Sequence, residues 1–194
     1  CVDINCHGGL LTYDVCYDGR DMMLTSCLGV VTDMGDYTQG LTQHDVRTAE
    51  IDETYTIRGT KASGNHYVAN KAEIDFTSAT GKRMMTLTMQ VSNNDVAYCY
   101  SFAGAATTNR DEPRRATILS EATSFNLPTT ATSFICPQID GNHQGWMSTK
   151  PSYEEEYKAD APLNEKSKFG QGYTFPCLFR IGNDGWAVPS PFLR

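Results

Sequence analysis

Three consecutive carboxylates, Glu154, Glu155 and Glu156, are the side chains of this sequence best suited to bind a cation. Adjacent negative charges repel one another unless a cation or water screens them. Calcium suits such a group because it takes several hard oxygen ligands in flexible geometry. Successive side chains of an extended segment point to opposite faces, so at most two of the three could face one site. A solvated acidic loop is the alternative for the same residues.

An aromatic segment surrounds this acidic run, from Trp146 through Tyr153 to Tyr157. A tryptophan ring can carry the CH-rich face of a sugar, which makes Trp146 a candidate substrate-binding residue. The same ring could instead close one end of a hydrophobic core. A second tryptophan, Trp186, follows the turn-forming residues Asn183-Asp184-Gly185 and is expected to be a packing residue.

The usual signatures of catalysis are missing from the sequence. It holds no GxSxG nucleophile elbow, no Walker A loop, no HExxH motif and no GxGxxG turn after a strand. The four histidines are not spaced for a metal. Three carboxylates that lie close together, Glu50, Asp52 and Glu53, are expected to decorate an exposed strand. We therefore predict no catalytic residue in this chain.

Seven cysteines are scattered along the chain without a CxxC pair, which excludes a zinc site of the usual spacing. An odd number cannot pair completely within one chain, so we expect mostly free thiols. Cys99 lies between Tyr98 and Tyr100 in a strand-like run and is expected to be a buried apolar filler. Cys1 fits the lipid-bearing first residue of a bacterial lipoprotein, and the boundary of a fragment is the favoured alternative.

The composition is that of an ordinary globular protein, with 40% apolar and 20% charged residues among 194. Nothing divides the chain, so one domain over residues 1–194 is expected. The net charge of −7 disfavours a nucleic-acid partner, because phosphate binding requires a basic stripe. No apolar run approaches 18 residues, so no transmembrane segment is expected.

Alternation of apolar and polar residues predicts an all-β fold, a large antiparallel sandwich. Residues 11–17 and 20–24 alternate on both sides of Asp18-Gly19, the pattern of a hairpin with a type I′ turn. No window longer than two turns keeps the 3.6-residue period of a helix. Further strands are predicted at 27–31, 53–58, 67–77, 84–91, 96–102, 117–127, 133–136 and 173–181.

Several segments, in the same order, resemble the N-terminal β-sandwich domain of glycoside hydrolase family 97. They are Ser26-Cys27-Leu28-Gly29-Val30, Asp52-Glu53-Thr54-Tyr55, Val91 to Tyr98, Glu121 to Pro128, Trp146 to Tyr157, Gly172 to Phe179, and Gly185-Trp186. The resemblance covers essentially the whole chain. It implies a supersandwich of the galactose-mutarotase type.

In that family the sandwich is joined to a catalytic (β/α)₈ barrel, and the enzymes are bacterial α-glucosidases and α-galactosidases. The resemblance implies that this chain packs on the barrel of the same parent polypeptide and completes a site for an oligosaccharide. It also implies calcium at that site, with Glu154 as the ligand from the sandwich and Glu155 as the competing choice. A periplasmic or cell-envelope location in a bacterium follows from the same likeness.

A (β/α)₈ barrel takes about 250 residues and is absent from this sequence. The two carboxylates of glycoside hydrolysis are therefore absent as well, and the chain alone is expected to be inactive. A single glutamate offers too few oxygens for tight calcium binding, so the chain alone should bind calcium weakly or not at all. The alternative function is that of a free-standing carbohydrate-binding sandwich with Trp146, Tyr153 and Tyr157 as an aromatic platform.

Overall fold

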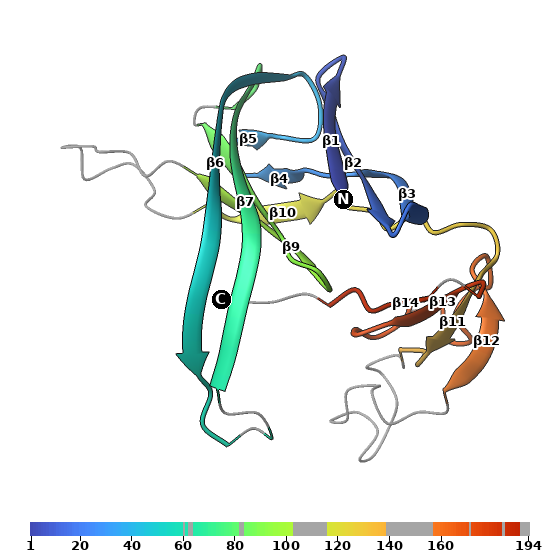
Figure 1. Cartoon of the computed structure of the whole chain (residues 1–194). Helices are drawn as coiled ribbons and strands as arrows, with labels where there is room; N and C mark the ends of the chain where they lie inside the picture. The colour runs from blue at the N-terminus through green and yellow to red at the C-terminus, as the bar shows by residue number, and fades with distance from the viewer. Residues whose placement is uncertain are drawn as a thin grey trace. The chain divides into compact units, whose positions relative to one another are not determined.

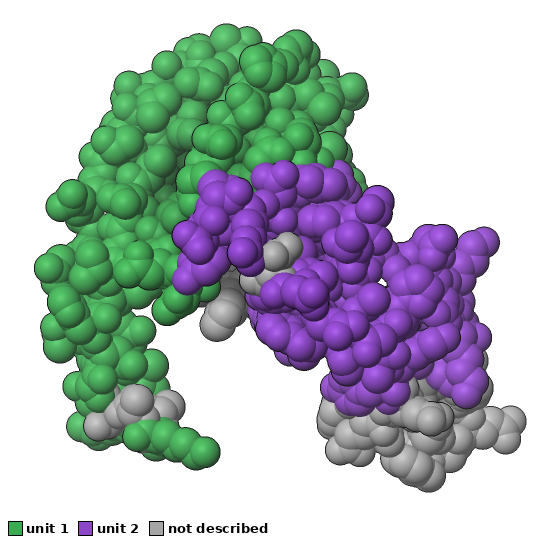
Figure 2. Space-filling model, turned by 45° about the vertical axis from the view of Figure 1, so that its right-hand side comes forward, with its two compact units in different colours: residues 1–15, 25–124 green, residues 16–24, 125–194 purple. Residues whose placement is uncertain are grey.

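The computed structural model describes residues 1–59, 61, 64–81, 84–102, 116–138, 157–170, 172–183 and 185–190. The chain divides into two compact units (Figure 2). Unit 1 comprises Cys1–Val15 and Thr25–Ser124, and unit 2 comprises Cys16–Leu24 and Phe125–Arg194. The single domain expected over residues 1–194 stays a prediction. Both units are built from β-strands (Figure 1).

The first sheet contains three strands in the order β1-β2-β3. They are β1 (Val2–His7), β2 (Leu10–Tyr17) and β3 (Arg20–Cys27). The turn between β2 and β3 has positive φ at both central residues, 51° at Asp18 and 72° at Gly19. This is the backbone of a type I′ turn, whose twist matches that of the flanking strands. The predicted hairpin is therefore confirmed.

The largest sheet belongs to unit 1 and has its strands in chain order, β6-β7-β8-β9. They are β6 (Leu41–Thr56), β7 (Gly64–Ser78), β8 (Met85–Val91) and β9 (Val96–Phe102). Only the end of β6 was expected from the sequence. Its first part, from Leu41 to Asp52, is exposed at nearly every position and lacks the apolar alternation that reveals a half-buried strand.

One face of this sheet, called the inward face below, holds much of the core of unit 1. Cross-strand pairs place Phe76 opposite Met85, Ile74 opposite Leu87, and Ala72 opposite Met89. Phe76, Met85 and Leu87 are completely buried. Side chains alternate along a strand, so the neighbouring residues Glu73 and Asp75 lie on the outward face.

A small sheet of β10 (Ile118–Glu121), β4 (Val30–Thr32) and β5 (Gly35–Asp36) also belongs to unit 1. Gly29 leads into it with φ 132°, and a Cβ atom there would lie 2.5 Å from the carbonyl oxygen of Tyr37. The Gly29 N–H donates to the hydroxyl of Tyr100 at 2.8 Å. The close approach of the Tyr37 carbonyl leaves no room for a side chain at position 29.

Unit 2 contains a four-stranded sheet in the order β12-β11-β13-β14. The strands are β11 (Ala131–Ile135), β12 (Lys158–Pro162), β13 (Leu178–Ile181) and β14 (Gly185–Ala187). One small core cluster contains Leu127, Ala131 and Ile181, and a second contains Ile135, Ala161 and Cys177. β1, β12 and β14 were not expected from the sequence, although the residues of β1, Val2 to His7, alternate between apolar and polar over their whole length.

All strand pairs described above are antiparallel, and the described residues contain no helix. The predicted all-β sandwich class is confirmed. Within the same residues, no helix is long and apolar enough to cross a membrane.

The cysteines differ from expectation at two places. Cys1 and Cys16 are disulfide-bonded, and they flank the outermost β1–β2 pair, Val2 opposite Val15. The other five cysteines form no disulfide, so the prediction that most of the thiols are not disulfide-bonded is confirmed. Cys99 is exposed, and its expected burial was wrong. Alternation along β9 turns Tyr98 and Tyr100 inward and leaves Cys99 on the outward face.

Candidate functional site

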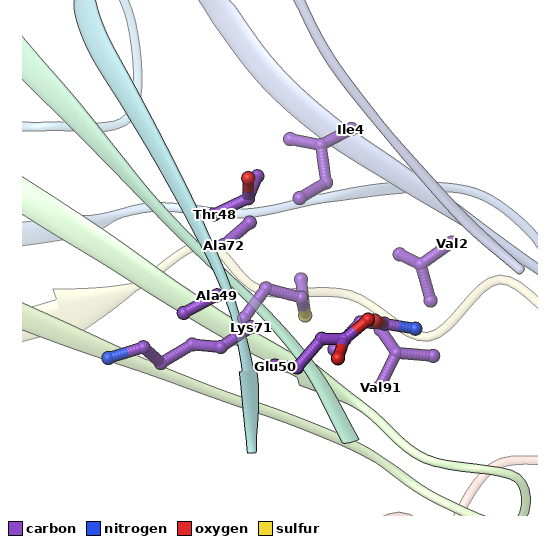
Figure 3. Close-up of a pocket in the computed structure, with 10 residues that line it drawn as sticks. Val2, Ile4, Thr48, Ala49, Glu50, Lys71, Ala72 and Val91 are labelled. Atoms are coloured by element: carbon purple, nitrogen blue, oxygen red, sulfur yellow. The ribbon is translucent and has the colours of Figure 1, made fainter.

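An open cavity of unit 1 lies between β1 and the inward face of the large sheet (Figure 3). Its volume is about 550 Å³, within the range typical of small-molecule sites. Apolar side chains form much of its wall: Val2 and Ile4 from β1, Ala72 from β7, and Met89 and Val91 from β8. The cavity marks the place where the core of the large sheet ends.

Strand register places polar groups on the rim of this cavity. Glu50 pairs with Asn70, and Thr48 pairs with Ala72, so all four share the inward face with the apolar wall. Lys71 lines the cavity, but its side chain points away from Val2 and Ile4 in Figure 3. Its ammonium donates to Glu73 at 2.9 Å, on the outward face.

The lining of this cavity is suited to binding. Glu50 is the only carboxylate among the lining residues, whereas glycoside hydrolysis requires a pair at fixed separation. Among the residues that the structure describes, no group of three or more His, Cys, Asp or Glu side chains could hold a metal ion. An apolar wall with a carboxylate and an amide at its rim is suited to contact another molecule or chain segment.

The outward face of the same sheet carries an ion-pair network centred on Arg47. Its guanidinium contacts Asp45 at 3.0 Å, Glu73 at 3.4 Å and the buried Asp75 at 2.6 Å. Asp75 also accepts a hydrogen bond from the Thr86 hydroxyl at 2.6 Å. The bonds from Arg47 and then from Thr86 lower the pKa of Asp75 to about 2. This network joins β6, β7 and β8 and has a structural role.

Asp75 should make the stability of the chain sensitive to acid. Its pKa is lower in the folded state than in the unfolded state, so its contribution is complete above about pH 4 and falls away toward pH 2. Asp75→Asn should lower the free energy of unfolding by about 1–2 kcal/mol at pH 7. It should also make this free energy decline less steeply between pH 4 and pH 2. Urea unfolding at several pH values measures both effects.

The matched control for this variant is Asp45→Asn, which removes an exposed partner of the same arginine. Exposed ion pairs contribute little to stability, so the free energy of unfolding of this variant should differ from that of the wild type by no more than about 0.5 kcal/mol. An unchanged acid slope in Asp75→Asn would contradict the assignment of that slope to Asp75.

Three tyrosines form a second cluster in unit 1. The rings of Tyr13 and Tyr98 lie 6.4 Å apart, and those of Tyr98 and Tyr100 lie 5.8 Å apart. The Tyr13 hydroxyl donates to the carbonyl of Ser124 at 3.1 Å. Burial raises the pKa of all three phenols above the ordinary value. They are therefore neutral near pH 7, and their hydroxyls hold the strands of the core together.

Trp186 lies in β14 of the unit 2 sheet and has 53% of its surface exposed. Its ring lies 5.6 Å from that of Phe134, and its cross-strand partner is Arg180. The guanidinium of Arg180 contacts Asp160 at 2.7 Å. Trp186 therefore packs against Phe134, as expected of a packing residue, while about half of its surface stays exposed.

The site residues expected from the sequence, Trp146 and Glu154, lie outside the described residues, as do Tyr153, Glu155 and Glu156. Tyr157 is described and is exposed. The cavity was not found from the sequence, although Glu50 was correctly expected on an exposed strand. The pairing of Glu50 with Asn70 joins positions 20 residues apart, and no local pattern reports it.

Comparison with known proteins gives a consistent result. The family model described as "Glycosyl-hydrolase 97 N-terminal" matches residues 1–189. Among solved structures, a beta-arabinopyranosidase is 39% identical with a TM-score of 0.84, and the match covers 96% of this chain and 29% of that one. No curated protein sequence matches the chain.

A Glycoside Hydrolase Family 97 enzyme from Pseudoalteromonas sp. strain K8 is similar in fold, both in complex with panose and in complex with acarbose. Each match has 15% identity and a TM-score of 0.70, and covers 93% of this chain and 25% of that one. The chain thus spans less than a third of the length of these solved proteins.

Proposed function

This chain belongs to the glycosyl-hydrolase 97 family as an N-terminal domain, and we propose that it packs on the catalytic barrel of a longer parent polypeptide and completes the active site there. The family match over residues 1–189 carries this proposal. The partial coverage of the arabinopyranosidase supports it, since more than two thirds of that protein lies beyond the matched part. The same match favours this role over that of a free-standing carbohydrate-binding module.

In this proposal the hydrolytic carboxylates come from the barrel, and the chain supplies contacts to it and to the oligosaccharide. The lining of the cavity in unit 1 is consistent with these separate roles, because it contains one carboxylate, Glu50, whereas hydrolysis needs two. Trp146 is proposed to contact the sugar through its ring.

Calcium is proposed as the cofactor of the assembled site, with Glu154 as one of its ligands. The described residues do not by themselves provide a metal-binding group, so further ligands would have to come from the parent. When bound there, calcium would supply positive charge close to the developing negative charge of the departing sugar oxygen. The role of Glu154 is to present one hard oxygen and to tie the sandwich to the barrel.

The substrate of the parent is proposed to be an α-galactoside or the corresponding arabinopyranoside. The identity of 39% with a beta-arabinopyranosidase supports this class. An L-arabinopyranosyl ring has the configuration of a D-galactopyranosyl ring and lacks only its exocyclic CH₂OH group. A glucoside differs at the C4 hydroxyl, which a site built for the galactose configuration would leave unpaired.

Aryl glycosides test the activity and its substrate class together. The purified parent should hydrolyse aryl β-L-arabinopyranoside or aryl α-D-galactoside with a kcat/KM roughly 10²-fold above that for aryl α-D-glucoside. The 194-residue chain alone should release no phenol from any of the three aryl glycosides. Preference for the glucoside would overturn the substrate class, and an inactive, folded parent would overturn the enzymatic role.

A periplasmic or cell-envelope location is proposed as well. The disulfide-bonded state of Cys1 and Cys16 supports it, because such bonds persist in oxidising compartments such as the bacterial periplasm. Fractionation of cells that produce the parent, followed by immunodetection, tests the location. Recovery of the parent in the cytoplasmic fraction alone would contradict it.

A further inference from the structure

The two longest strands of unit 1 extend beyond the rest of their sheet (Figure 1). β8 ends at Val91, opposite Asn70, whereas β6 and β7 remain paired for six further positions, from Ile51 opposite Ala69 to Thr56 opposite Gly64. We call this two-stranded part, residues 51–56 and 64–69, the arm. A two-stranded part of a sheet buries little of its own surface, so contact with another chain segment would stabilise the arm.

Side chains on the outward face of the arm contact other residues of unit 1. Ile51, Ala69 and Tyr67 share this face by register, and Ala69 is buried. The Tyr67 hydroxyl donates to Asp95 at 3.4 Å, and burial raises the pKa of this phenol. The residues next to β9 thus partly cover the outward face of the arm.

The inward face of the arm is different. Val68 lies on it, opposite Asp52, and 54% of its surface is exposed. Asp52 in turn is hydrogen-bonded to the imidazole of His66 at 2.7 Å, so this face carries a polar pair beside an exposed apolar side chain. Toward the core the same face continues through Glu50 and Asn70 into the apolar cavity of about 550 Å³. Val68 and the cavity therefore form one continuous surface.

We propose that this surface, the inward face of the arm together with the adjoining cavity, is where the remaining part of the parent polypeptide docks onto unit 1. The inference rests on the proposed function and names the surface that it uses. The matched arabinopyranosidase has more than two thirds of its chain beyond the part similar to this one, which supplies an occupant of sufficient size. An occupant on the same polypeptide also has a high effective concentration.

A second copy of this chain fits the surface less well. A two-fold interface would bring Glu50 and Asp52 of one copy close to the same carboxylates of the other, in a chain whose net charge is already −7. The expected occupant has apolar side chains for Val68 and the cavity wall, and hydrogen-bond donors for the carboxylate of Glu50.

Two lysine substitutions on opposite faces of the arm test this surface. Val68→Lys changes the inward face, and Tyr55→Lys changes the outward face, where the tyrosine is 44% exposed. In the chain alone, Val68→Lys should shift the melting temperature by less than about 2 °C, because a lysine opposite Asp52 is exposed and paired. In the parent it should lower the melting temperature by about 5 °C or more, because docking would bury its charge.

Tyr55→Lys should give the same small shift in the chain and in the parent. Hydrogen exchange on the wild type provides a second measurement: the amides of residues 64–69 should exchange at least 10-fold more slowly in the parent. Equal shifts for Val68→Lys in both proteins, with equal exchange, would overturn the proposal. Dimerisation of the wild-type chain that Val68→Lys abolishes would overturn it in favour of a second copy. An inactive parent that still protects these amides would overturn only the proposed enzymatic function.

Discussion

Gly29→Ala is expected to destabilise the chain by about 3–5 kcal/mol, a large fraction of the stability of an ordinary domain. Gly29 has φ 132°, a conformation that an L-residue with a side chain rarely adopts. The new Cβ would also lie 2.5 Å from the carbonyl oxygen of Tyr37, which backbone pairing holds in place through the Tyr37 N–H bond to Val30. Urea unfolding followed by circular dichroism measures the loss.

Gly19→Ala is the matched control. Gly19 also has positive φ, 72°, but nothing lies within 4 Å of the position its Cβ would occupy. This variant should lose only the cost of the backbone conformation, about 1–2 kcal/mol. If both variants unfold at the same urea concentration, the close approach of Tyr37 is not what requires glycine at position 29.

In the full-length parent, Glu154→Gln should weaken calcium binding and hydrolysis together, by about 10- to 100-fold each. An amide oxygen is a poorer ligand than a carboxylate for a hard cation, and the substitution also removes one negative charge from the site. Calorimetric titration with calcium measures the affinity, and kcat/KM at saturating and limiting calcium shows whether added metal restores the rate.

Glu155→Gln and Glu156→Gln serve as controls, because they remove the same charge from the same run. Both should retain wild-type calcium affinity within about threefold. A loss in Glu155→Gln with no change in Glu154→Gln would transfer the ligand assignment to Glu155. Wild-type calcium dependence in all three variants would remove the acidic run from the metal site.

Local patterns predicted the elements whose burial alternates. The hairpin at Asp18-Gly19 and the strands β7, β8 and β9 were expected within a few residues of their actual bounds, because one face of each is apolar and the other polar. The ordered set of short motifs indicated the family, which the match over residues 1–189 confirms. The first part of β6 escaped prediction because the sheet, and not its own sequence, holds it extended.

The sequence by itself determined the all-β class and the family, since both follow from residue types and their order along the chain. Only the tertiary structure decided that Glu50, Asn70 and Val68 share one face with an apolar cavity, and that Cys99 and half of Trp186 are exposed. The physical reason is that strand register determines which side chains contact one another, and the position where β8 ends determines which remain exposed to solvent. Those are properties of pairing between distant segments, which no local pattern records.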